Sequence, residues 1–197
     1  MSRTRTPAIT AWDIGAPADW AALPLEPLDR PETRQRIREA AEELADGEGA
    51  RRLERFLLAA QPGLLDDPLV LLAVWVPDRE AGIPQGVLKV ELLTDADLET
   101  FESMVTHAAP LPGQERLHLE VLRTELPAGP AVVVDHQGAV DGVVEQYLQL
   151  CVFPPGTTDA VSLGFATTAL HLVEDLALAA RTIAESLVVR LGEEHDR

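Results

Sequence analysis

One serine of this chain lies in a sequence similar to a nucleophile elbow. Ser162 is the central residue of Ala160-Val161-Ser162-Leu163-Gly164, and an acid and an imidazole follow it at Asp175 and His195. Such a serine attacks a carbonyl only where a tight strand–turn–helix exposes its hydroxyl beside a histidine. The residues around Ser162 instead continue one strand pattern, and His195 lies in a charged terminal stretch. We therefore expect no catalytic residue at this position.

A second kind of chemistry would need histidines and acids at metal-ligand spacing. His171 and Glu174 lie three residues apart at the start of a predicted helix, where a polar residue and an acid near the positive end of the helix dipole are ordinary. Glu115 and His118 share the spacing, but on a strand it puts side chains on opposite faces. The other histidines have no neighbour at ligand spacing: His107, His136 and His195. We expect no metal site.

Two further nucleophile types occur once each in the sequence. Cys151 lies inside the apolar run Leu148–Phe153, which predicts a small buried side chain rather than a reactive thiol. A single cysteine also excludes an intrachain disulfide. Lys89 alternates with Val87 and Glu91 on a predicted strand, so we expect a cross-strand ion pair there and no Schiff-base lysine.

No cofactor site is expected. Gly47-Glu48-Gly49 has no strand before it and no third glycine, so it does not form a dinucleotide loop. Asp95 and Asp97 lie where a helix begins and are explained as caps. The tryptophans are expected in the core or in a lid rather than on a base-stacking platform: Trp12, Trp20 and Trp75. The formal net charge of −17 repels phosphate backbones and anionic membranes, which excludes nucleic acid as an expected partner.

The elements that must position these residues are mostly strands in the second half of the chain. Turn residues occur at Pro127–Pro130, His136–Gly138 and Pro154–Gly156. They separate four predicted strands, at about 116–126, 129–135, 143–153 and 160–168. The connections are too short to hold crossover helices, so neighbouring strands are predicted to be antiparallel.

The first half predicts helices that cover this sheet. A strand at 9–14 and an extended linker from Pro17 to Leu25 precede two helical segments, which begin at Asp29-Arg30-Pro31 and end before Pro62. The fully apolar run 69–76 predicts a strand buried on both faces. A strand at 87–93, a helix after Thr94–Asp97 and a last helix at about 170–188 follow. Helical spacing puts Phe56 and Met104 on buried faces.

These elements predict an α+β protein: an antiparallel sheet of about six or seven strands covered by helices. We expect a single domain over residues 8–190, with flexible tails at 1–7 and 191–197. The chain has an apolar content of 46%, which is typical of a globular protein.

Three segments in this order resemble the PsbP-like fold group, which includes many small actinobacterial proteins of unassigned function. They are Asp19–Leu25, the turn at Leu126–Pro130, and the strand Val161–Thr168 that leads into a closing helix. The resemblance implies a PsbP-like α/β/α sandwich, a role as a partner-binding or accessory subunit, and no family-wide catalytic residues. Several members are exported lipoproteins. Here the start of the sequence predicts neither a secretory signal nor a lipid-attachment cysteine, so a cytoplasmic location is expected.

The sequence therefore favours a non-enzymatic cytoplasmic accessory or adaptor protein that binds another protein. One alternative is a small-molecule-binding module or minor enzyme, with a pocket between sheet and helix lined by His118, Glu120 and Tyr147. Another is an acidic immunity protein or secretion chaperone that masks a basic protein. A homodimer is a further alternative.

Overall fold

The computed structural model describes residues 7–65, 69–110 and 113–192. Its helices are α1 (Pro31–Leu44), α2 (Gly47–Leu64), α3 (Leu98–His107), the short 3-10 turn η1 (Leu170–Leu172) and α4 (Val173–Glu185). Its strands are β1 (Ala8–Asp13), β2 (Trp20–Leu23), β3 (Leu71–Trp75), β4 (Gly86–Leu93), β5 (Gln114–Leu126), β6 (Gly129–Val140), β7 (Val143–Val152), β8 (Ala160–Thr167) and β9 (Val188–Gly192).

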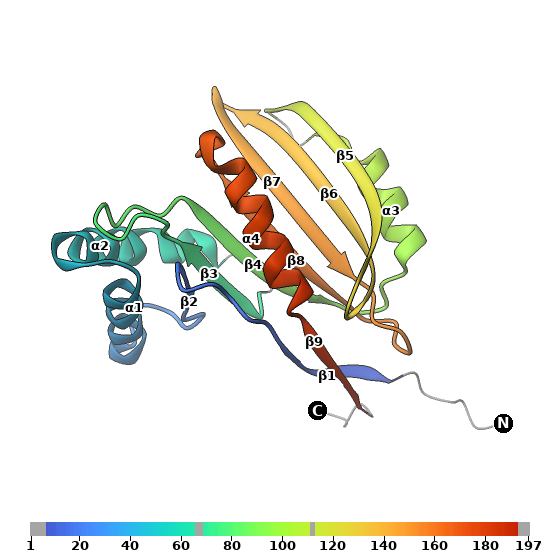
Figure 1. Cartoon of the computed structure of the whole chain (residues 1–197), viewed down its shortest axis with the longest axis horizontal. Coiled ribbons are helices and arrows are strands. Elements are labelled where there is room, and N and C mark those ends of the chain that lie inside the picture. Colours follow the sequence, from blue (N-terminus) through green and yellow to red (C-terminus); the bar gives the residue numbers. More distant parts are fainter. Residues whose placement is uncertain (1–6, 66–68, 111–112, 193–197) are drawn as a thin grey trace.

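Most of these strands form one antiparallel sheet (Figure 1). In the described residues it has seven strands in the order β2-β3-β4-β8-β7-β6-β5, and every neighbouring pair is antiparallel. Strands β5 to β8 are neighbours in chain order, as their short connections predict. The predicted α+β sandwich around an antiparallel sheet is confirmed.

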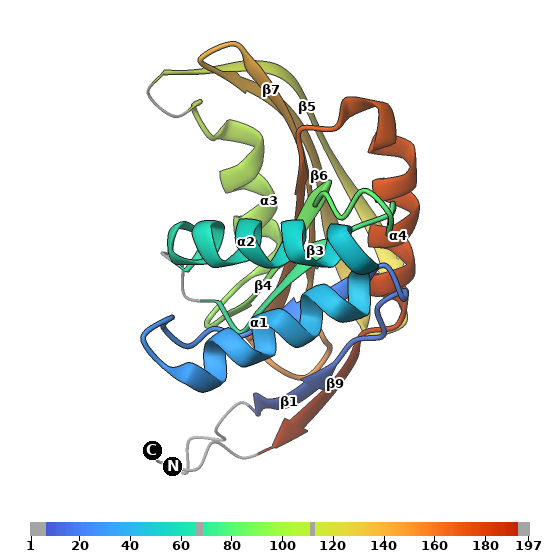
Figure 2. The ribbon, with the colours of Figure 1, turned by 90° about the vertical axis from the view of Figure 1, so that its left-hand side faces the viewer.

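Helices lie on both faces of the sheet, but unequally (Figure 2). Helix α4 packs alone along β7 and β8 on one side, which we call the α4 face. Helices α1, α2 and α3 lie on the opposite side, which we call the three-helix face. Because strand side chains alternate, each strand contributes every second residue to each face.

The α4 face carries one continuous apolar core. The largest fully buried side chain is Phe165, which meets the Trp20 indole edge-on with ring centroids 5.9 Å apart. Trp20 also stacks on Trp75, with an interplanar angle of 10°. Leu176, Ala180 and Ile183 close the core from α4, and the sequence predicts all of them on its buried stripe.

The three-helix face instead carries two separate apolar clusters. One lies under α1 and α2 and includes Ile37, Leu53 and Leu72. The other lies under α3 and includes Phe101 and Phe153. The strands between the two clusters are β4, β8 and β7, and they present polar side chains to this face. The candidate site lies in this interval between the clusters.

Two predicted core residues are exposed. Phe56 on α2 is 51% exposed and Met104 on α3 is 60% exposed, so their assignment to buried faces is wrong. The buried sides of the two helices are narrower than their apolar spacing predicts. Leu57 on α2 and Phe101 on α3 pack into the two clusters, while Phe56 and Met104 lie beside those contacts.

Three boundaries also differ from the predictions. Part of the predicted linker forms β2, because Trp20 and Leu23 bury their side chains against the sheet. The predicted turn at His136–Gly138 is wrong, since β6 continues to Val140 and the turn is Asp141-Gly142, both with positive φ. Helix α2 includes Pro62 and ends at Leu64, rather than stopping before the proline.

The last described element is a strand that the sequence did not predict. Helix α4 stops at Glu185, and β9 then pairs antiparallel with β1 as far as Gly192. Ser186 fixes this change of direction. Its hydroxyl accepts a hydrogen bond from Gly15 N at 2.8 Å. The same hydroxyl can donate to the carbonyl oxygen of Ile183, at 2.6 Å, or to that of Gly15, at 3.1 Å. Among the described helices, none combines the length and the apolar character needed to cross a bilayer.

Candidate functional site

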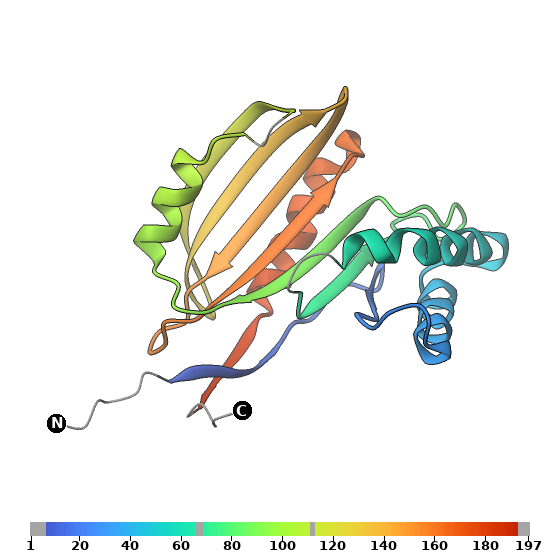
Figure 3. The same ribbon diagram turned by 180° about the vertical axis from the view of Figure 1, so that it is seen from behind.

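The interval between the two clusters on the three-helix face is a hollow of about 310 Å³. Figure 3 shows this part of the sheet between α2 and α3. We call its polar side chains, together with one glycine, the polar belt: Lys89 and Glu91 on β4, Glu145, Tyr147 and Gln149 on β7, and Ser162 and Gly164 on β8. Strand register puts Lys89, Gly164 and Gln149 in one row across three strands.

The polar belt is internally ordered. Gln149 Nε2 donates a hydrogen bond to the Ser162 hydroxyl oxygen at 2.8 Å. The Tyr147 side chain lies against Gly164, because a Cβ added there would come within 2.6 Å of the Tyr147 hydroxyl. The glycine therefore makes room for the tyrosine. The belt offers carboxylates, an amine, an amide and hydroxyls to a bound molecule, which are groups that orient a polar ligand.

Ser162 has none of the geometry of a nucleophile elbow. It lies in the middle of β8, paired with Glu91 on one side and Cys151 on the other. Asp175 lies in the first turn of α4, on the opposite face of the sheet. His195 lies outside the described residues. The structure thus separates the serine from the acid that the sequence pattern supplied.

Cys151 is buried in β7, as the sequence predicts. Burial, and after it the negative charge of Glu91, raises the pKa of the thiol to about 12. A cysteine with this pKa stays protonated at neutral pH, and the thiol is a poor nucleophile compared with the thiolate.

The candidate pocket residues of the sequence analysis do not come together. Tyr147 belongs to the polar belt, whereas His118 and Glu120 lie on the α4 face of β5. Glu115 also lies on that face, because a β-bulge between Arg116 and His118 adds one residue to the strand. The expectation that Glu115 and His118 point to opposite faces is therefore wrong.

Histidines and acids do not gather into a metal site in the part of the chain that the structure describes. No group of three or more potential ligands is found there. His171 in η1 and Glu174 in α4 are both exposed. His136 is half-buried on β6, where burial, followed by the charge of Arg116, lowers the pKa of its imidazole. Both effects favour the neutral form of the His136 imidazole.

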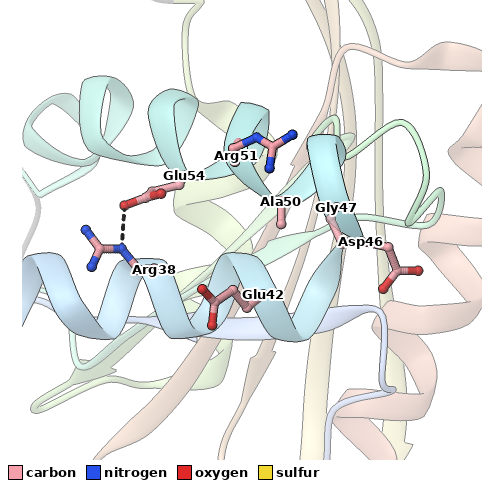
Figure 4. A pocket seen from close by; sticks show the side chains of 8 residues that line it. Arg38, Glu42, Asp46, Gly47, Ala50, Arg51 and Glu54 are labelled. Atoms are coloured by element: carbon pink, nitrogen blue, oxygen red, sulfur yellow. Dashed lines mark hydrogen bonds and ion pairs between the residues drawn. The ribbon is translucent and has the colours of Figure 1, made fainter.

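A second hollow, of about 390 Å³, lies between α1 and α2 (Figure 4). Arg38 Nε donates to Glu54 Oε1 across it at 3.0 Å, and Glu42, Asp46 and Arg51 complete its rim. The side chains of Arg38 and Glu54 are partly open to solvent, where an ion pair contributes little to stability. This groove combines both signs of charge, so its charge favours neither an anionic nor a cationic ligand.

The α4 face of β5 and β6 is a third candidate surface, because α4 leaves it uncovered (Figure 1). Leu122 and Val133 are opposite each other there, and Leu122 is 51% exposed. In the next row Glu120 is opposite Asp135. We call this surface, with Glu115 beyond the bulge, the acidic face.

Comparison with known proteins shows a likeness of fold. No family model and no curated protein matches the sequence. Among solved structures, the chain is similar to LpqN of Mycobacterium tuberculosis, which is described as involved in cell envelope biogenesis. The TM-score is 0.51 and the identity 14%, over 95% of this chain and 87% of that one. A Bacteroides thetaiotaomicron protein aligns at a TM-score of 0.47 and 10% identity, over 94% of this chain and 48% of that one.

Sequence reasoning named Tyr147 but missed its belt neighbours Glu145 and Gln149, although a signal for them exists. Glu145, Tyr147 and Gln149 alternate along β7, and polar residues at every second position of a strand indicate a face that is not packed in a core. The matching positions on β4 are Lys89 and Glu91. What the sequence could not supply is the pairing of both strands with β8.

Proposed function

We propose that this protein is a non-enzymatic cytoplasmic accessory or adaptor protein that binds another protein. The observation that carries the proposal is the uncovered α4 face of β5 and β6, where Leu122 is half-exposed beside an acidic row. Leu122 lies directly opposite Val133 on this open face, so the two apolar side chains together offer a surface on which a partner can pack. The net charge of −17 favours a basic partner.

Two likenesses support this proposal by analogy. The resemblance to the PsbP-like fold group implies accessory, partner-binding roles. LpqN shares the fold and is described as involved in cell envelope biogenesis, which is a process and not a reaction. Fold analogy is associational, so the proposal depends on the exposed surface of this chain.

A pull-down with matched variants tests this function. We expect tagged protein to recover one stoichiometric partner from a lysate of its native host. Leu122→Asp should abolish that recovery, because it places a charge where the apolar contact forms. Leu178→Asp is the matched control, since Leu178 is 68% exposed on α4 and lies outside the acidic face. Absence of any stoichiometric partner across lysates and salt concentrations would contradict the proposal.

The polar belt supports a second candidate function, the binding of a small polar molecule. Its hollow of about 310 Å³ brings polar groups from three strands together, which a purely structural face has no need to do. We expect ¹H–¹⁵N spectra recorded with an extract of polar metabolites to shift resonances of β4, β7 and β8.

Charge-neutralising variants separate the two hollows. Glu91→Gln should remove these shifts, because Glu91 lines the belt. Glu42→Gln, in the groove between α1 and α2, should leave them unchanged. Shifts that survive Glu91→Gln, or that map to α1 and α2, would exclude the belt as the ligand site.

A further inference from the structure

We propose that the acidic face and the edge of β5 together bind an extended basic segment of the partner, which adds to the sheet as a further strand. This proposal rests on the proposed function and names its surface and the chemistry of its partner. The segment would present alternating basic and apolar side chains to the α4 face.

The free edge supplies the backbone part of the interaction. β5 is the last strand in the sheet order and pairs with β6 alone among the described strands. Its outer N–H and C=O groups can therefore pair with another extended chain. The bulge at Arg116–His118 interrupts the ladder, so the regular part of this edge runs from His118 to Leu126.

The side chains of the acidic face supply the specificity. Glu120 is directly opposite Asp135, and like charges at such positions on neighbouring strands destabilise a sheet. Gln146 Nε2 donates a hydrogen bond to Asp135 Oδ1, but an amide does not neutralise the charge. No arginine or lysine forms an ion pair with either carboxylate within the described ranges. A lysine or arginine of a bound strand would compensate both carboxylates.

The apolar row formed by Leu122 and Val133 determines which side chains the segment must carry. Leu122 lies two residues from Glu120, so both point to the α4 face. A strand laid along β5 would place an apolar side chain beside Leu122 and a basic one beside Glu120. The expected pattern is therefore apolar–x–basic along the segment, repeated over the regular edge.

Charge also decides against a second copy of this chain as the occupant. Two molecules of net charge −17 repel each other at long range. A β5–β5 pair would bring the Glu120–Asp135 rows of both molecules onto one sheet without adding a cation. A basic partner lowers the electrostatic energy at the same position.

Titration with designed peptides tests the inference. The probe is a fluorescent, capped peptide as long as His118–Leu126, in which threonines alternate with lysine and valine. We expect it to bind the wild-type chain and to weaken as salt is raised. For the double variant Glu120→Gln/Asp135→Asn, we expect the affinity for the peptide to fall by about tenfold or more. Removing like charges should not cost stability, so a weaker affinity would not reflect unfolding.

Matched controls separate strand addition from general attraction to an acidic protein. Glu125→Gln should bind as wild type does, because Glu125 lies on the other face of the same strand. N-methylation of alternate peptide residues should abolish binding by blocking the backbone ladder. Replacing lysine with glutamate in the peptide should do the same.

Three results would overturn the inference: no binding of the lysine peptide, equal binding to the double variant, or equal binding of the N-methylated peptide. If the pull-down still recovers a partner in a Leu122-dependent manner, the proposed function stands and only this account of the segment fails. If no partner is recovered, the proposed function fails, whatever the peptides do.

Discussion

Phe165→Ala is expected to lower the free energy of unfolding by about 3–5 kcal/mol. Phe165 is 0% exposed at the centre of β8 and lies between Leu88 and Leu148 in the sheet register. Its ring meets Trp20 edge-on at 5.9 Å. Truncation loses the transfer free energy of the ring and leaves a cavity that neighbouring strands cannot close. For a chain of this size, the loss corresponds to a fall in melting temperature of roughly 6–20 °C.

Phe56→Ala is the matched control for this prediction. It removes the same atoms from a side chain that is 51% exposed on α2, so we expect a change within about 0.5 kcal/mol. Urea denaturation of both variants measures the difference. Comparable losses would mean that the core of the α4 face is not where the structure puts it.

The hairpin region was predictable because its information is local. Each strand from β5 to β8 follows its neighbour after a short turn, so alternation and turn residues determine both the pairing and its antiparallel sense. The one hairpin turn whose position was predicted wrongly is also explained by local sequence. Asp141-Gly142 is a two-residue hairpin signal, whereas Gly138 belongs to the strand, where a Cβ would come within 2.8 Å of Gln114 Nε2.

The remaining errors depend on contacts between distant parts of the chain. Val188–Gly192 continues an apolar pattern that also suits a helix, and it becomes a strand because β1 lies beside it. Trp20–Leu23 becomes a strand because β3 offers it an edge. In both cases the deciding partner is too far along the chain for local periodicity to indicate it.

The candidate surfaces were predictable only in part, for the same reason. The sequence identifies Ser162, Lys89 and Tyr147 as single candidate residues. The polar belt, however, exists because β4 and β7 both pair with β8. The acidic face depends on a bulge that moves Glu115 to the side of Glu120. A bulge reverses the side-chain alternation after it, and the sequence carries no clear mark of this one.

The second large effect is expected at Gly82. This residue has φ of +58°, and a Cβ there would lie 2.3 Å from the carbonyl oxygen of Gly49 in the first turn of α2. The obstacle is backbone, so it cannot rotate away. The loop is also held in place: Asp78 accepts hydrogen bonds from Glu80 N at 3.0 Å and Ala81 N at 2.9 Å.

Gly82→Ala should therefore cost more than the strain of a left-handed residue. Gly47 has φ of +51° with open space around it, so Gly47→Ala measures the conformational cost alone, about 1–2 kcal/mol. The clash should add roughly 1–3 kcal/mol for Gly82→Ala. Urea denaturation of the two variants isolates the close packing of the loop on α2. Equal losses would show that this loop does not hold α2, whose last residue, Leu64, borders the polar belt.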